Sequence, residues 1–430
     1  MKKNSSTMQL YIIFSIIVLY APQFSQYFGL LFEQFLTLGI TIMIFFFILQ
    51  KKNSIPACAV LCSFTFLAIF CIDLLRSVDF VVTNDFFELI KPFSFLLYFS
   101  LGYNAHFTST EIKKYSSWFM LNFLVISLLS VGEASVVCIN DIFTILYKSP
   151  RLALKMKAVF SFISPYCLAT ILVLPFVYFL LMFFASRKLK YIFAVLLCGS
   201  ALLLTQSKTV FLGVILTFFI MICIVLKSRW IIGRKRILFT SITFFIVIVM
   251  SLPLLLMFAK EKLAYLYEGL EIFFKAFSNF DMLEVLNAQP NTRLRFEQFL
   301  FALEHQDFFP LIGVAIGKAV LMPESFYALY LYRTGLIGIF IHTFMVLFAV
   351  RRAALLSKHY AILNNIQLSS FYFSLVIFFI SLVFSYFSSA VTDQTRIAFF
   401  FYFLIGHLYS IPLNQFIVTK KSMYKNKFKE

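Results

Sequence analysis

Twelve apolar stretches follow one another along this sequence and constrain its fold more than any other feature. A helix that crosses the hydrocarbon core of a bilayer needs about 20 apolar residues. The composition agrees: 61% of the 430 residues are hydrophobic and 13% are charged, whereas soluble domains are about half apolar and a quarter charged. The sequence therefore predicts an all-α, polytopic integral membrane bundle of about 12 transmembrane helices, forming one domain over residues 1–430. The expected spans are 8–22, 29–49, 55–75, 88–104, 118–138, 162–185, 191–206, 209–226, 237–258, 326–349, 367–389 and 397–414.

Basic residues gather on one side of the alternating spans. That side holds 22 of the 37 Lys and Arg residues, including Lys2, Lys3 and the C-terminal tail, and only two acids, Glu111 and Glu430. Short cytoplasmic loops carry an excess of Lys and Arg, so this side is expected to be cytoplasmic. Both termini are then cytoplasmic as well.

The net charge of +18 follows from this topology rather than from a nucleic-acid partner. The sequence contains no basic-aromatic RNA motif, so we expect no nucleic acid to bind. The seven cysteines lie in or beside apolar runs and form no C-x-x-C pair, which argues against a zinc site or a disulfide framework. No Asp-x-Asp pair occurs, so we expect no metal, no cofactor and no nucleotide-sugar donor site.

Two loops on the opposite, outward side are long, at roughly 139–161 and 259–325. Loops of such length are usually functional or partly structured. Within the larger loop, the apolar spacing is helical over 263–277 and again over 296–303. Amphipathic helices of this kind can lie in the headgroup region of a membrane. The large loop either packs on the bundle or binds a substrate, and the sequence leaves both alternatives open.

Cations on the outward side suggest an anionic ligand, such as a lipid-linked diphosphate, because Arg matches phosphate oxygens with a rigid fork of donors. Arg333 lies about two turns inside its predicted span, where a charge is expected to face a cavity or a partner. Lys148, Lys155 and Lys157 are expected on a solvated face instead. The candidates for ligand binding are Arg151, Lys208, Arg293, Arg295 and Arg333.

Three acids stand out. Glu33 and Glu133 have apolar surroundings and are expected to form structural pairs that hold helix interfaces. Glu324 lies at the start of a span, where it could act as a base or favour the positive end of the helix dipole. Glu324 and Arg333 would point to opposite sides of one regular helix, whereas Tyr330 and Arg333 share a face with Phe326. That aromatic and cationic face suits a sugar or a phosphate.

The second half of the chain carries three motifs in a fixed order. The first is Arg151 followed by Phe-Ser-Phe-Ile-Ser-Pro at 160–165, the second is Leu-Thr-Gln-Ser-Lys-Thr at 204–209, and the third runs through 293–296, 309–314, 324–327 and 333–338. This third segment contains Arg-Leu-Arg-Phe, Phe-Pro-Leu-Ile-Gly-Val, Glu-Ser-Phe-Tyr and Arg-Thr-Gly-Leu-Ile-Gly. In order and topology, residues 150–340 resemble the bacterial O-antigen polymerase (Wzy) family, within the wider polymerase and ligase group.

The resemblance implies an enzyme of the bacterial inner membrane that acts on undecaprenyl-diphosphate-linked oligosaccharide at the periplasmic face, with 259–325 as the large periplasmic loop. The growing glycan would leave its diphosphate and join the terminal sugar of a new repeat unit, without a metal. Membrane lipid and a chain-length regulator protein are the other partners that it implies. The expected roles are catalytic for Glu324, Arg293 and Arg295, and binding of diphosphate or glycan for Arg151, Lys208, Tyr330 and Arg333.

Two alternatives remain at this point. The first alternative is an O-antigen ligase. Ligases of the group tend to have a His near the start of the span after the large loop. Glu324 stands at that place here, which weakens the ligase alternative. A flippase or other transporter would also have about twelve spans with internal charges, but transporters commonly show two related halves, and this sequence shows no comparable repeat.

Overall fold

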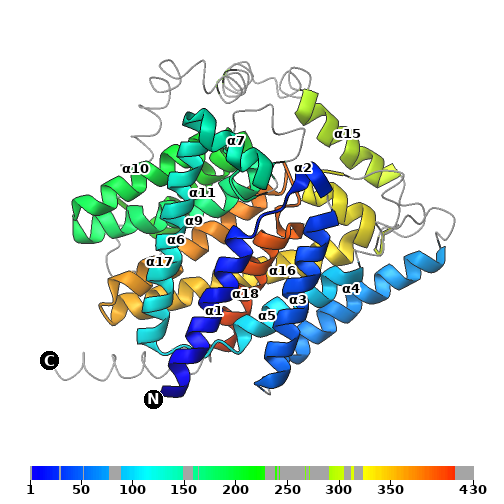
Figure 1. Ribbon diagram of the computed structural model, residues 1–430, viewed down its shortest axis with the longest axis horizontal. Helices are drawn as coiled ribbons and strands as arrows, with labels where there is room; N and C mark the ends of the chain where they lie inside the picture. Colours follow the sequence, from blue (N-terminus) through cyan, green and yellow to red (C-terminus); the bar gives the residue numbers. More distant parts are fainter. Residues whose placement is uncertain are drawn as a thin grey trace.

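The computed structural model describes residues 2–28, 31–51, 53–76, 89–148, 158–162, 164–227, 290–304, 311–313 and 323–411, together with 238, 239, 242, 267 and 271. Every regular element within these residues is a helix, so the protein is all-α as predicted (Figure 1). The helices are α1 (Lys2–Tyr20), α2 (Ser25–Phe28), α3 (Leu31–Gln50), α4 (Ala57–Arg76), α5 (Ile90–Tyr103), α6 (Ser109–Ser135), α7 (Val137–Leu146), α9 (Pro165–Ser186), α10 (Leu189–Leu204), α11 (Lys208–Lys227), α15 (Pro290–Glu304), α16 (Phe326–Ile362), α17 (Ile366–Ser385), η3 (Val391–Asp393) and α18 (Thr395–Ser410).

Four of these helices, α6, α9, α16 and α17, are long and apolar enough to cross a membrane. Eleven of the twelve predicted spans fall on helices, and the remaining one, 237–258, lies almost entirely outside the described residues. The helix ends differ most at α16, which continues to Ile362, well past the predicted end at residue 349.

The interior is formed by α9, α17 and α18. Burial covers 83% of the most apolar stretch of α9 and 78% of that of α17, against 39% for both α6 and α16. The inner helices are therefore covered by protein on nearly all sides, while α6 and α16 leave apolar faces exposed. Side chains of α18 are buried along almost its whole length.

The last helix is joined to the first by a buried cation. Arg396, which is 3% exposed, donates hydrogen bonds to the carbonyl oxygens of Val18, Leu19 and Ala21 at the end of α1. The last carbonyls of a helix have no partner within the helix and carry the negative end of its dipole. A guanidinium satisfies both requirements, so Arg396 fixes α18 against α1.

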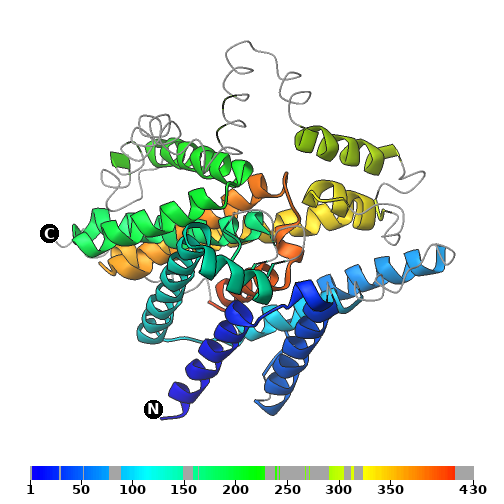
Figure 2. The ribbon, with the colours of Figure 1, turned by 45° about the horizontal axis from the view of Figure 1, so that its top comes forward.

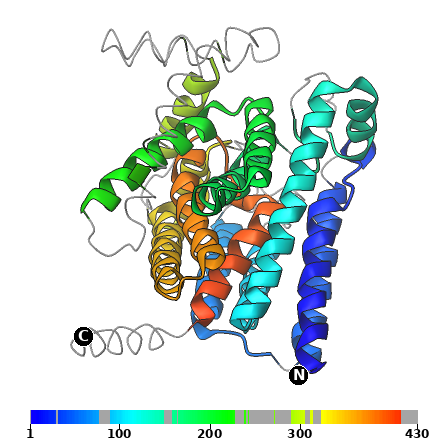
Figure 3. The ribbon, with the colours of Figure 1, turned by 90° about the vertical axis from the view of Figure 1, so that its left-hand side faces the viewer.

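Helices α7 and α15 lie at one end of the molecule, and the start of α1 lies at the other (Figures 1 and 3). The structure shows that 139–161 is not simply a loop, because α7 forms its first part after an extended residue, Val136, ends α6. The helical spacing over 296–303 is confirmed by α15, which packs beside α16 (Figure 2). The other amphipathic stretch, 263–277, lies outside the described residues apart from Tyr267 and Glu271.

Helix α16 is broken at Gly335, whose φ of 60° and ψ of −158° are not helical. The segment 311–313 fills the break: the carbonyl of Leu311 accepts a hydrogen bond from the N–H of Ile337 at 3.1 Å. A Cβ at Gly335 would lie 2.4 Å from that carbonyl oxygen, and Gly313 also has a positive φ, of 73°. Glycine is required at both positions, because L side chains disfavour this conformation and the backbones touch. Gly313 and Gly335, which belong to two separate sequence motifs, thus form one structural unit.

Candidate functional site

Three segments that are distant in sequence meet around Arg295. Its guanidinium donates to the hydroxyl of Tyr166 at 3.3 Å and lies 3.5 Å from the carboxylate of Glu324. The guanidinium carbon also lies 5.3 Å from the centre of the Tyr166 ring, a cation–π geometry. Helix α15 supplies the arginine, the first turn of α9 supplies the tyrosine, and the residues before α16 supply the acid. We call Tyr166, Arg295 and Glu324 the arginine cluster.

The two predicted catalytic arginines do not lie together. Arg293 forms an ion pair with Glu297 at 2.8 Å on the exposed surface of α15, with its side chain 64% exposed. The side chain of Arg295 is only 15% exposed. Residues two apart on a helix point in different directions. Of the two, the structure therefore brings only Arg295 to Glu324.

Glu324 is held through its backbone and presents its carboxylate to the outside. Its N–H donates to the side-chain oxygen of Gln298 at 3.0 Å, and its carbonyl accepts from the N–H of Ala390 at 2.9 Å. The next residue, Ser325, is the N-cap of α16 and accepts from the N–H of Ala328. The side chain of Glu324 is 59% exposed beside Arg295. Its carboxylate is thus fixed at the positive end of α16 and remains accessible.

A second polar group lies farther along α16. The hydroxyl of Tyr330 donates to one carboxylate oxygen of Asp393 at 2.8 Å, and the ammonium of Lys91 donates to the other at 3.1 Å. These residues line a cavity of about 30 Å³ together with Arg333 and Thr334. We call this the polar cavity. It joins α5, α16 and η3 and contains two cations and one carboxylate.

The predicted aromatic and cationic face of α16 is present. The rings of Phe326 and Tyr330 stack with centroids 4.0 Å apart, and Tyr330 and Arg333 line the same cavity. Arg333 is 5% exposed, so a charge at this depth does face a cavity, as expected. Glu324 has its contact with Arg295 and belongs to the other group, in agreement with the expected separation from Arg333.

Lys208 begins α11, directly after the turn at 205–207, in which Gln206 has a φ of 54°. The adjacent Thr209 forms a hydroxyl–hydroxyl contact with Ser388, which ties this turn to the residues after α17. Lys208 is half-buried there. Arg151, the remaining predicted binding residue, lies outside the described residues.

Sequence reasoning did not select Lys91 or Asp393. A signal for Lys91 exists, because it lies three residues inside the predicted span 88–104, and a charge within a span marks a functional or paired site. Asp393 lies between the last two predicted spans, in a turn that contains no other acid. Its pairing with Lys91 joins positions 302 residues apart and is not visible in either segment alone.

Glu133 forms the structural pair that the sequence predicted, but its partner corrects another prediction. Lys148 was expected on a solvated face; it is instead fully buried, with its ammonium 3.0 Å from the carboxylate of Glu133. The second carboxylate oxygen accepts from the N–H groups of Val159 and Phe160 at 3.0 and 2.7 Å. Lys148 also contacts Asn140 of α7. The lysine is buried because the helix α7 folds it back onto α6. The side chain of Glu33 is not among those described.

The described residues include no group of three His, Cys, Asp or Glu side chains that could hold a metal ion. The arginine cluster and the polar cavity offer charged and hydrogen-bonding side chains. Together they suit an anionic ligand and a nearby hydroxyl.

The fold and these polar groups define an all-α protein with several helices that could cross a membrane. The chain matches no protein-family model, and no curated protein matches its sequence.

Proposed function

We propose that this protein is a membrane-embedded glycosyltransferase that polymerises lipid-diphosphate-linked oligosaccharide repeat units, as its resemblance to O-antigen polymerases implies. The arginine cluster is the observation that carries this proposal. It joins a cation for a leaving diphosphate and an accessible carboxylate for an acceptor hydroxyl within one contact of 3.5 Å. Both groups come from the motif segments on which the resemblance rests.

The proposed setting is the bacterial inner membrane, crossed about 12 times, with both termini in the cytoplasm and 259–325 in the periplasm. Helices at eleven of the predicted spans support this number. The position of α7 and α15 at the end opposite the start of α1 supports an outward face for both loops (Figure 1). The arginine cluster would then lie at the periplasmic face.

In the proposed reaction, the hydroxyl of the acceptor sugar attacks the anomeric carbon of the growing glycan. A new glycosidic C–O bond forms while the bond between that carbon and the diphosphate oxygen breaks. The hydroxyl proton passes to the carboxylate of Glu324, and the bonding electrons leave with the diphosphate. Arg295 stabilises the charge that develops on the leaving group. Arg293, on the exposed side of α15, would contact the glycan or the diphosphate from outside.

Gel analysis of surface glycan from a deletion strain tests the proposal. Loss of a polymerase leaves single repeat units on the cell surface, and the protein supplied from a plasmid restores long chains. Loss of a ligase would leave polymer on the lipid carrier, and loss of a flippase would leave no exported repeat units. Either of these last two patterns contradicts the proposal.

A lipid-linked oligosaccharide flippase is the second candidate. The charges of the polar cavity favour it, because transporters place ionisable residues inside the bundle along a substrate path. Lys91, Arg333 and Asp393 would then contact the headgroup during its passage. An O-antigen ligase is the third candidate and would use the same arginine cluster on a different acceptor. The banding pattern separates all three.

A further inference from the structure

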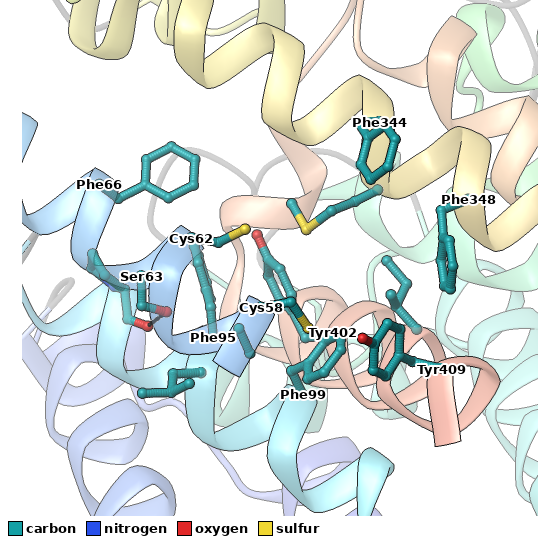
Figure 4. A pocket seen from close by; sticks show the side chains of 15 residues that line it. Cys58, Cys62, Ser63, Phe66, Phe95, Phe99, Phe344, Phe348, Tyr402 and Tyr409 are labelled. Atoms are coloured by element: carbon teal, nitrogen blue, oxygen red, sulfur yellow. Dashed lines mark hydrogen bonds between the residues drawn. The ribbon is translucent and has the colours of Figure 1, made fainter. Parts of the chain in front are cut away.

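A cavity of about 320 Å³ lies among α4, α5, α16 and α18, and we call it the apolar cavity. Of the 15 described residues that line it, none is charged. Figure 4 shows aromatic side chains around one space, with Phe66 of α4 opposite Phe348 of α16. The hydroxyl of Ser63 in its wall already donates to the carbonyl of Pro92 at 3.0 Å. A buried water needs several polar partners, so this space suits hydrocarbon better than water.

The apolar cavity reaches the surface of the helix bundle at α16. Phe344, one of its lining residues, is 63% exposed. Apolar side chains beside it are exposed as well, with Leu347 of α16 at 62% and Leu61 of α4 at 69%. In the proposed membrane setting, this surface would face the hydrocarbon of the bilayer. A lipid chain could then enter the cavity from the side.

One end of the apolar cavity lies beside two adjacent arginines of α16, Arg351 and Arg352. The guanidinium carbon of Arg352 lies 5.2 Å from the centre of the Phe348 ring. Phe348 and Tyr409 both line the cavity, with ring centroids 5.7 Å apart. Arg352 also donates to the carbonyl of Ile411 at 3.2 Å, whereas Arg351 is exposed. The thickness of one aromatic ring therefore separates a guanidinium from the cavity.

This arginine pair carries a positive charge that no carboxylate among the described residues balances through an ion pair. Arginine matches phosphate oxygens with a rigid fork of donors. Basic pockets between membrane helices bind the headgroups of anionic lipids. The pair also lies about 25 Å farther along α16 than Gly335, at a rise of 1.5 Å per residue. It is therefore separate from the arginine cluster at the start of that helix.

We propose that the apolar cavity holds one acyl chain of an anionic phospholipid, whose phosphate lies at Arg351 and Arg352. A hydrocarbon chain gains little by moving from the bilayer into the cavity, because lipid tails are as apolar as the side chains there. The headgroup therefore determines which lipid is retained, and two arginines select a negative one. The second acyl chain would lie outside, against Phe344 and Leu347. This site does not depend on the proposed reaction.

Photocrosslinking to the full-length protein in phosphatidylcholine nanodiscs tests this site. Two probes, phosphatidylglycerol and phosphatidylcholine with the same diazirine in one acyl chain, are compared at equal mole fraction, and mass spectrometry locates the crosslinked peptides. We expect the phosphatidylglycerol probe to label the cavity-lining faces of α4, α5, α16 and α18 about tenfold more than the other. Equal labelling by the two probes would overturn the proposal. Stronger displacement of the probe by polyprenyl phosphate than by unlabelled phosphatidylglycerol would also overturn it.

A pair of arginine substitutions tests the headgroup position. Arg351 is exposed, so Arg351→Gln should leave the protein folded. It should lower labelling by the phosphatidylglycerol probe about fivefold and leave labelling by the phosphatidylcholine probe unchanged. Arg187→Gln is the matched control, because Arg187 is an exposed arginine at the end of α9. An unchanged ratio between the probes in Arg351→Gln would exclude the arginine pair as the headgroup site.

A pair of substitutions on α4 tests the position of the acyl chain. Ala59 lines the apolar cavity, whereas Leu61 is exposed on the same helix. Ala59→Phe should lower labelling by the phosphatidylglycerol probe about tenfold by filling the cavity, and Leu61→Phe should leave it at the wild-type level. Undiminished labelling in the Ala59→Phe protein would exclude this cavity. The map of crosslinks on the wild-type protein tests the same point without any substitution.

Discussion

Arg295 lies 3.5 Å from Glu324 although 28 residues separate them in the sequence, and the same guanidinium covers the ring of Tyr166. The contact links α15 directly to the residue before the N-cap of α16. It joins the large loop to the bundle at the place where the proposed reaction occurs. It also makes the two arginines of α15 unequal, because only one of them reaches the acid.

The first prediction concerns this inequality. Arg295→Gln should lower the rate of polymerisation by about 100-fold, since it removes a donor that stabilises developing negative charge. Arg293→Gln is the matched change on the exposed side of α15 and should have a clearly smaller effect. The measurement is chain elongation by the purified protein in vesicles with lipid-diphosphate-linked repeat units. Equal losses in the two variants would contradict the geometry.

Glu324→Gln should lower the same rate by about 100-fold or more, because the amide cannot accept the hydroxyl proton. The side chain keeps its size, so the protein should remain folded in the membrane. Glu297→Gln is the control, because it removes an exposed carboxylate on α15 that pairs with Arg293. A Glu324→Gln protein that elongates chains at the normal rate would exclude this residue as the base.

Removal of one partner of the buried pair should destabilise the protein. Lys148→Ala leaves Glu133 buried without its cation, which typically costs about 3–5 kcal/mol of unfolding free energy. Lys114→Ala removes an exposed lysine from α6 and should change stability little. Unfolding in detergent micelles, followed by tryptophan fluorescence, checks the difference. Equal stability of the two variants would show that Lys148 does not occupy its buried position.

Gly335→Ala should also destabilise the protein, by about 1–3 kcal/mol, because a residue with a Cβ is strained at this backbone conformation. The added atom would also meet the carbonyl of Leu311 at 2.4 Å. Gly39 in α3 is a suitable control, since a Cβ there meets nothing within 4 Å. Gly39→Ala should be neutral or slightly stabilising. The same unfolding measurement compares them, and a neutral Gly335→Ala would argue against the break in α16.

The polar cavity gives a prediction about coupling. Asp393→Asn and Lys91→Met should each destabilise the protein, and the double variant should lose less than the sum of the two, because the residues share one contact of 3.1 Å. A double-mutant cycle measured by unfolding in detergent micelles gives the coupling. Strict additivity would mean that the two side chains act independently.

The hydropathy of the sequence was sufficient to locate eleven helical segments, because each is an apolar run of nearly the length a membrane requires. It did not reveal α7, since this helix is short and follows α6 after a single extended residue, Val136. The topology analysis also predicted a solvated Lys148, because counting the charges of a loop does not show that α7 folds back onto α6. Local sequence carries no information about a contact of this kind.

At the candidate site, too, the sequence predicted relations within one segment but not contacts between distant segments. Helical spacing correctly grouped Arg333 with Tyr330, because both lie within one helix. Glu324 lies before the N-cap of α16, and its contact with Arg295 separates it from Arg333. The contact between Arg295 and Glu324 and that between Lys91 and Asp393 depend on how distant helices pack. The residue types at both sites were visible in the sequence, but their partners were set by tertiary structure.

The break at Gly335 divides α16 into two rotational registers. A turn of 3.6 residues relates side-chain directions only along an uninterrupted helix. The angular position of Tyr330 or Arg333 therefore does not determine that of Phe344 or Phe348, although one apolar run contains all four. A one-residue insertion on either side of Gly335 would rotate only its own half of the helix. The polar cavity before the break and the helix face that carries Phe344 and Phe348 after it can thus change independently, while a single glycine keeps the two halves joined.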